Sequence, residues 1–134
     1  MKFEPIVAAN FDFDIGLPYF HLVVKRLCWP LLVEGGTTFP HKERCLRVEI
    51  VLCEDIPYND WFEKMLTETF TGVLTCMDRK GAEKLIVTFH NMKLVERGFD
   101  LDYTNLGPLR ARLVFRYDHI EEKLLPPTEV ITTI

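Results

Sequence analysis

Alternating apolar and polar residues, the pattern of half-buried β-strands, recur along most of this sequence. The longest example is Cys45–Cys53, where Leu46, Val48, Ile50 and Leu52 share one face. Further strands are predicted at Phe11–Ile15, Phe20–Cys28, Gly72–Met77, Lys84–His90 continued by Met92–Glu96, Phe99–Tyr103 and Leu109–Tyr117. The turn Asp78–Gly81 joins two of these strands into a hairpin, with Gly81 at the position that favours a positive φ.

One segment, about residues 60–70, has the period of a helix instead. Its apolar side chains fall on one helical face and form a packing surface: Trp61, Phe62, Met65, Leu66 and Phe70. Asn59 or Asp60 can cap its first turn. The sequence therefore predicts a mainly β fold, an antiparallel sandwich or barrel of about six or seven strands with one flanking helix.

The 134 residues are enough for one domain, and no linker or repeat divides them. We expect a single domain over 1–134, with an N-terminal arm at 1–10 and a C-terminal tail at 124–134. The Gly- and Pro-containing segment Glu34–Arg44 is predicted to be a loop. The apolar runs are far shorter than the roughly 18 residues of a membrane-spanning helix, and the first residues do not resemble a signal peptide.

Charge argues against a protein that grips nucleic acid. Sixteen Lys and Arg against twenty Asp and Glu give a net charge of −4, whereas phosphate-backbone binding needs a basic surface. Three arginines nevertheless share one face of the last predicted strand: Arg110, Arg112 and Arg116. They can pair with acids of a neighbouring strand, bind phosphate, or pair with a second subunit, and the first reading is favoured in an acidic chain.

No set of residues forms a recognisable catalytic motif. The chain has no serine, and its histidines are scattered at His21, His41, His90 and His119. Asp118 adjoins His119, but neighbouring strand residues point to opposite faces, so this carboxylate does not orient that imidazole. We therefore expect no enzymatic activity and no cofactor.

The acidic pairs Asp12/Asp14 and Asp100/Asp102 each place two carboxylates on one strand face. Such pairs can hold a divalent cation, but the solvated face of an amphipathic strand is the simpler explanation. No metal site is therefore predicted.

The four cysteines contain no C-x-x-C pair and fit no common zinc spacing: Cys28, Cys45, Cys53 and Cys76. Free thiols are the favoured state. In an oxidising exterior, however, Cys45 or Cys53 can form a disulfide with a neighbouring subunit.

Large apolar residues also stand where a small monomer would leave them exposed. Val51 and Val114 lie opposite the core-facing residues of their strands, Trp29 and Phe39 lie at predicted loops, and Val130–Ile134 is an apolar end. Self-assembly would cover this surface together with any open sheet edges.

The order of these segments resembles the tail tube proteins of contractile-tailed phages and related injection machines. The likeness spans about Phe11 to Glu122 and is most telling near the end, where Leu101-Asp102-Tyr103 precedes an alternating strand that finishes with Tyr117-Asp118. This resemblance implies stacked, hexameric rings around a channel, each subunit a β-sandwich with a flanking helix.

The resemblance further implies a structural protein of a virion tail, assembled in the host cytoplasm, whose tube conducts DNA during genome ejection. Its partners would be further copies of itself and the sheath, baseplate and tape-measure proteins, without a membrane. Because a conduit should not hold DNA, we expect acidic residues toward the lumen, namely Glu49, Asp100 and Asp102. The stripe Arg110, Arg112 and Arg116 would make contacts between subunits.

Two alternatives remain open at this point. Because Glu34–Arg44 is compact where many tube proteins carry a long loop to the next ring, a tube-like ring of the baseplate or the tail terminator is the nearer alternative. A small β-barrel that binds a ligand in its interior is an alternative of another class, and it requires an enclosed apolar pocket.

Overall fold

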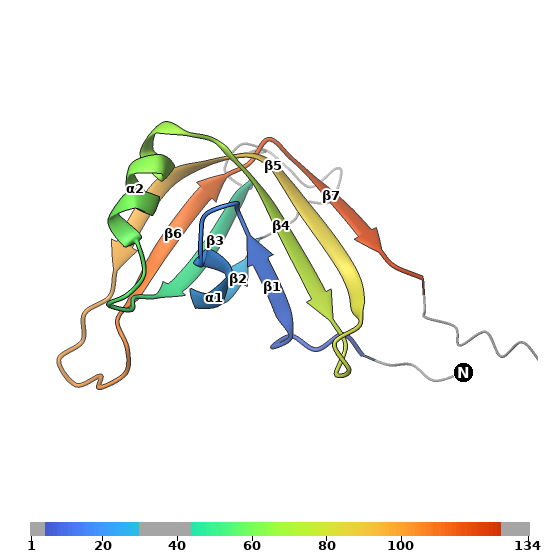
Figure 1. Ribbon diagram of the computed structural model, residues 1–134, viewed down its shortest axis with the longest axis horizontal. Helices are drawn as coiled ribbons and strands as arrows, with labels where there is room; N and C mark the ends of the chain where they lie inside the picture. Colours follow the sequence, from blue (N-terminus) through green and yellow to red (C-terminus); the bar gives the residue numbers. More distant parts are fainter. Residues whose placement is uncertain (1–4, 30–43, 127–134) are drawn as a thin grey trace, which may run out of the picture.

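The computed structural model describes residues 5–29 and 44–126. Seven antiparallel strands and two helices follow one another along this part of the chain (Figure 1). The elements are β1 (Phe11–Asp14), α1 (Phe20–Val23), β2 (Val24–Cys28), β3 (Cys45–Val51), α2 (Tyr58–Thr67), β4 (Phe70–Met77), β5 (Glu83–Phe99), β6 (Arg110–Arg116) and β7 (His119–Leu124). The mainly β, antiparallel class predicted from the sequence is confirmed.

The long strand β5 belongs to both layers of the fold. Its residues 83–92 pair with β4, and part of this segment also pairs with β7, whereas residues 93–99 pair with β6. One layer therefore has the order β1-β4-β5-β7 and the other β5-β6-β3-β2. Figure 1 shows the two layers leaning together and meeting where β5 bends.

Asn91 forms the bend of β5. Its φ of 53° is left-handed, a conformation that Asn adopts more readily than most residues. The Asn91 side-chain amide donates to the carboxylate of Asp118 at 3.0 Å, and the backbone N–H of Asp118 donates to the His90 carbonyl at 2.9 Å. The corner between β6 and β7 thus holds the bend of β5 in place.

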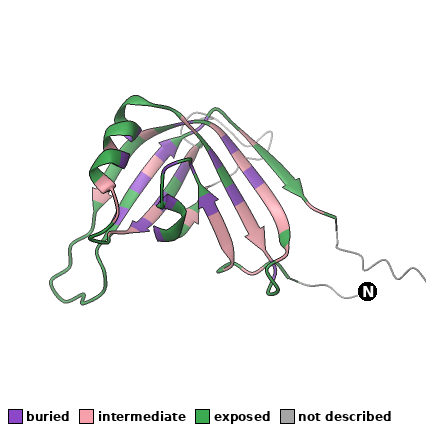
Figure 2. Cartoon of the chain, in the orientation of Figure 1, coloured by how far each residue is buried: buried purple, intermediate pink, exposed green. Residues whose placement is uncertain are grey.

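The core lies between the two layers and follows the predicted alternation. Leu46, Val48 and Ile50 of β3 are buried, and the facing residues of β6 are buried as well (Figure 2). These two strands pair in the register Val48↔Leu113. Edge-to-face aromatic contacts fill the space between the layers: Phe13–Phe89, Phe13–Phe20, Phe20–Trp61, Trp29–Phe89 and Phe89–Tyr117.

Helix α2 packs against the second half of β5. Trp61 and Met65 are buried, and the Arg97 guanidinium of β5 lies 3.8 Å from the centre of the Phe62 ring. Arg97 also donates to the Tyr58 hydroxyl at 3.2 Å. These contacts fix the helix over strand residues that pair only with β6 within the described part of the chain.

The predicted limits of this helix were wrong at both ends. It starts at Tyr58 after Pro57, so Asn59 and Asp60 lie inside its first turn rather than capping it. It ends at Thr67, and Phe70 is the first residue of β4, where it pairs with Met92. Leu66, expected on the packing face, is 60% exposed.

The predicted strand Phe20–Cys28 is also wrong in its first half, which forms the short helix α1. Phe20 and Val23 are both buried, and their spacing of three residues suits one helical turn against the core. Tyr19, with a φ of 65°, turns the chain into this helix. Because apolar residues stand at consecutive positions here, the sequence fits the period of a strand as well as that of a helix. The helix forms because it buries both Phe20 and Val23 in the core.

The predicted strand Phe99–Tyr103 is wrong beyond its first residue, because β5 ends at Phe99 and the chain continues as a loop to β6. The Asp102 side chain accepts hydrogen bonds from the backbone N–H and the hydroxyl of Thr104, at 3.0 and 2.8 Å. This local turn competes with strand pairing. Conversely, the strand β7 was not predicted, since charged residues outnumber apolar ones along it.

The hairpin turn between β4 and β5 confirms its prediction. Gly81 has a φ of 85°, and the Asp78 carboxylate accepts from the backbone N–H groups of Lys80 and Ala82 at 2.9 and 3.0 Å. The hydrogen bond from Ala82 is the main cause of a lowered pKa of Asp78. Asp78 is buried although it is charged, and its hydrogen bonds to the backbone hold the turn in place.

Candidate assembly surfaces

The outer face of β3 and β6 carries most of the charged residues predicted to make contacts. Arg110, Arg112 and Arg116 are all exposed on this face of β6. Arg112 lies opposite Glu49 in the strand register, and its Nε is 3.0 Å from an Asp100 carboxylate oxygen. The structure thus shows one of these arginines paired within its own chain. Because both partners are largely exposed, such a pair contributes little stability, about 0–1 kcal/mol.

A hollow of about 580 Å³ lies over this face and is open to solvent. Its lining combines both signs of charge, with Arg26, Arg47 and Arg112 beside Glu49, Glu96 and Asp100. The charged residues of both signs in its lining distinguish this open hollow from an enclosed apolar ligand pocket.

The structure brings two of the three predicted lumen-facing acids together and leaves out the third. Glu49 of β3 and Asp100, the first residue after β5, both line the hollow, whereas Asp102, two residues further along the same loop, is not part of its lining. There the Thr104 backbone N–H, followed by the Thr104 hydroxyl, lowers the pKa of Asp102 by hydrogen bonding its charged form. The Asp102 carboxylate thus stabilises the local turn in this loop.

The β5–β6 loop, residues 100–109, forms an exposed surface that was not predicted from the sequence. It projects beyond the strands at the end opposite the bend of β5 (Figure 1), and every residue of it is exposed. Three of its apolar side chains are almost fully exposed: Leu101 at 84%, Tyr103 at 102% and Leu106 at 98%. Such a grouping is typical of an interaction surface.

Strand edges are a second feature suited to assembly. In the described part of the chain, β1 and β7 are the outermost strands of one layer, and β2 and the second half of β5 are those of the other. β2 exposes Lys25 and Arg26, and β7 exposes Glu121 and Glu122. Open edges can pair with another chain, and charged residues restrict which chain does so.

All four cysteines are free thiols in the monomer. Cys53 is exposed just beyond β3, and Cys45 lines the hollow together with Cys28. Burial raises the pKa of Cys76, which makes its thiolate scarce. Cys45 and Cys53 stay predictions as contacts between subunits.

Two histidines that the sequence analysis found scattered are neighbours in space. The rings of His90 and His119 stack with centres 4.2 Å apart and planes 12° from parallel. Each Nε2 lies 3.4 Å from the same Glu121 carboxylate oxygen. Asp118 binds Asn91 instead, so it does not orient the adjacent imidazole, as the strand geometry predicts.

Several predicted regions lie outside the described residues. These are the first part of the N-terminal arm, the loop Glu34–Arg44 except for its last residue, and the end of the C-terminal tail including Val130–Ile134. Within residues 5–29 and 44–126, no helix is both long enough and apolar enough to span a membrane.

No protein-family model matches the sequence, and no curated protein matches it. Solved structures do match. A chain of the anti-feeding prophage (AFP) baseplate in a six-fold symmetrised cryo-EM structure has a TM-score of 0.61 at 18% identity, covering 91% of this chain and 97% of that one. The AFP tube-terminating cap gives 0.63 at 10% identity, covering 93% and 95%, and Hcp1 from Flavobacterium johnsoniae gives 0.55 at 13%, covering 84% and 94%.

This chain has the tail-tube fold. The likeness covers most of both chains in each case. The fold inferred from the resemblance to tail tube proteins is thereby confirmed.

Proposed function

We propose that this protein is a structural, ring-forming component of a contractile tail or injection system. The observation that carries the proposal is the match over nearly the full length of both chains to proteins from a baseplate, a sheath–tube complex and a tube-terminating cap. The exposed apolar β5–β6 loop supports the same proposal, because assembly would cover it.

The proposed assembly is a homohexameric ring that stacks into a tube. One matching structure is described as six-fold symmetrised, which supports this number. The interface would join different surfaces of successive subunits, since head-to-tail contacts close into rings. We propose the apolar loop, the strand edges and the stripe Arg110, Arg112 and Arg116 as its parts, with Glu49 and Asp100 as candidates for the lumen.

In a phage the tube would conduct DNA during ejection, in contact with sheath, baseplate and tape-measure proteins, after assembly in the host cytoplasm. The net charge of −4 supports a channel that nucleic acid passes without binding. No catalytic role and no cofactor are part of the proposal. Aromatic side chains fill the space between the layers, which favours the structural role over a ligand-binding barrel.

A tube-like ring of the baseplate or the tail end is the second candidate. It is favoured by the AFP baseplate match at 18% identity and by the matches to a terminating cap and a sheath/tube terminator. The copy number in purified particles separates the two candidates. A repeating tube protein occurs in many rings per particle, and a baseplate or terminator protein in one or a few.

The oligomeric state of the untagged protein tests the proposed ring. We expect size-exclusion chromatography with light scattering to give a mass of about six subunits, and negative-stain microscopy to show rings or tubes. A protein that stays monomeric at high concentration, alone and with its tail partners, would refute the ring.

A loop variant tests which surface closes the ring. In Leu101→Ser/Tyr103→Ser/Leu106→Ser, we expect loss of rings, since each apolar side chain buried at an interface contributes about 1.5–3 kcal/mol. The matched control is Leu66→Ser, which removes an exposed leucine of α2. Rings in all variants would show that the loop lies outside the interface.

A further inference from the structure

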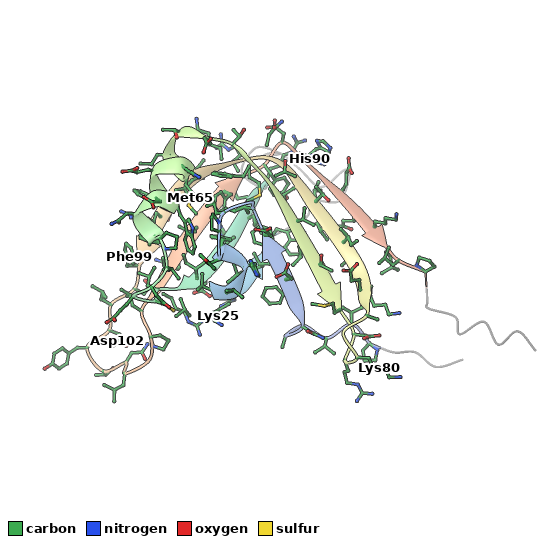
Figure 3. All side chains as sticks on the ribbon, viewed as in Figure 1. Lys25, Met65, Lys80, His90, Phe99 and Asp102 are labelled. Carbon is green, nitrogen blue, oxygen red and sulfur yellow. The ribbon has the colours of Figure 1, made fainter. Side chains whose placement is uncertain are left out.

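His90, His119 and Glu121 form a cluster of potential metal ligands that the tail-tube fold and the proposed ring leave unexplained. Their ligating atoms all lie within 4.8 Å of one another. The cluster sits where β5 bends and β7 begins, at the position marked by His90 in Figure 3.

Strand register places these three side chains on one face. His90 of β5 pairs directly with His119 of β7, and directly paired residues project to the same side of a sheet. Glu121 follows His119 by two residues, and the two-residue period of a strand returns it to that side. The cluster is therefore a product of the β5–β7 pairing.

The distances suit ligands of a common ion better than they suit hydrogen bonds. Each Nε2 lies 3.4 Å from the shared Glu121 oxygen, whereas a good hydrogen bond from nitrogen is about 2.7–3.2 Å. Around a tetrahedral zinc ion with bonds of about 2.0–2.1 Å, neighbouring ligand atoms are about 3.3–3.4 Å apart. In addition, the His90 Nε2 atom is shielded from solvent and makes no hydrogen bond to any described group.

The backbone around the cluster is held firmly. The Asp118 backbone N–H binds the His90 carbonyl, and the Arg44 guanidinium donates to the Asp118 carbonyl at 2.9 Å. The Asn91 amide binds the Asp118 side chain. The backbone of the two ligand-bearing strands therefore needs little rearrangement when an ion binds, which lowers the cost of binding.

We propose that His90, His119 and Glu121 bind a borderline divalent metal ion of the zinc type, with water as the fourth ligand. Two imidazoles and one carboxylate are a ligand set that zinc accepts, and imidazole favours zinc, copper and nickel over magnesium or calcium. An imidazole lone pair lies in the plane of its ring, so two nearly parallel rings must turn about their side-chain bonds before both Nε2 atoms can point at one ion. The exposed His119 ring has room for this rotation.

The ion would tie β7 to β5 at the corner of the fold. β7 exposes most of its side chains, so backbone pairing with β5 supplies most of its attachment. A metal bridge at the first pair of this ladder would suppress fraying of β7 from that end.

Titration of the untagged, metal-stripped protein with Zn²⁺ tests the site by calorimetry, with Co²⁺ absorption as a report on geometry. We expect one saturable ion per chain and the visible absorption of tetrahedral Co²⁺. His119→Ala and Glu121→Gln should each weaken Zn²⁺ binding at least tenfold, because even residues behind the ligands change affinity by about 10–100-fold. His21→Ala, an exposed histidine of α1, is the matched control and should bind as the unchanged protein does.

Three results would overturn the proposal. The first is that no saturable binding occurs below about 1 mM Zn²⁺, and the second is that His119→Ala and Glu121→Gln bind Zn²⁺ as tightly as the unchanged protein does. The third is that binding is lost in the control His21→Ala or in His41→Ala, another histidine outside the cluster. Circular dichroism confirms that each variant is folded, and Glu121→Gln keeps the shape of the side chain. Hydrogen exchange gives a second readout, since Zn²⁺ should slow exchange of the β7 amides. All these measurements apply to monomer and ring alike, so their outcome is independent of the proposed assembly.

Discussion

Gly72 is the position where the packing between the layers leaves no room for a side chain. It is buried in β4 and pairs with Phe89. A Cβ atom at Gly72 would lie 2.5 Å from the sulfur of Met92 and 2.9 Å from Cζ of Phe13. The Met92 thioether can move, but the Phe13 ring is fully buried and held by edge contacts to two other rings.

The replacement Gly72→Ala should therefore destabilise the fold. Overpacking of a core costs about 1–3 kcal/mol. Removing the backbone freedom of a strand glycine returns about 0.5–1 kcal/mol. Urea unfolding followed by tryptophan fluorescence measures the difference, and with an m-value near 2 kcal/mol/M each 2 kcal/mol lowers the midpoint by about 1 M.

Gly98→Ala is the matched control, because Gly98 lies in β5 and a Cβ there would meet only the end of the Arg112 side chain at 3.5 Å. Both variants gain the same backbone term, so the difference between them, about 1–3 kcal/mol, isolates the steric cost at Gly72. Both are measured at one protein concentration, since association stabilises by mass action. Equal midpoints would refute the close approach of Met92 and Phe13.

Two further perturbations probe single contacts. Asp78→Asn should lower the urea midpoint at neutral pH, because hydrogen bonds, chiefly from the Ala82 N–H, lower the pKa of Asp78. The stability that the carboxylate contributes is present above its unfolded pKa of about 3.9 and is lost as the pH falls through the folded pKa. The difference in midpoint between the unchanged protein and the variant should therefore disappear in acid, and a difference that is constant with pH would contradict the reasoning. Arg97→Lys keeps the charge but loses the contact of the guanidinium with the Phe62 ring, and it should cost about 0.5–1 kcal/mol by the same assay. The exposed Arg47→Lys is the neutral control, and equal losses in the two variants would exclude the ring contact.

The strands with strict alternation are the elements that could be predicted from sequence. β3 and β6 each have apolar residues on every second position, and a single sheet face explains that pattern. The turn at Gly81 was equally accessible, because few residues other than glycine tolerate its φ.

Elements whose conformation depends on tertiary contacts could not be predicted. Phe20–Val23 is too short to have a clear period, and its helix exists because both end residues reach the core. β7 has few apolar residues and exists because the bend at Asn91 presents an edge of β5 to it. The pairing of β7 with that edge also brings His90 and His119 together. Because the two histidines are far apart in the sequence, their contact could not be predicted from it.

The candidate assembly surfaces were only partly foreseeable. The arginine stripe of β6 follows from alternation, and its exposure confirms the predicted face. Leu101 and Tyr103 alternate with acids and so look like a strand, but the hydrogen bonds of Asp102 to Thr104 make a turn that leaves both side chains in solvent.

The passage of β5 through both layers has a mechanical consequence. A force applied to the β1-β4-β5-β7 layer reaches the other layer along a covalent backbone, without depending on side chains that can slide past one another. Separation of the layers therefore requires the strand to straighten at Asn91 and to break the hydrogen bonds that hold the corner. In a particle built from such subunits, the backbone of β5 would transmit load between the two layers of each subunit and resist a change in the angle between them.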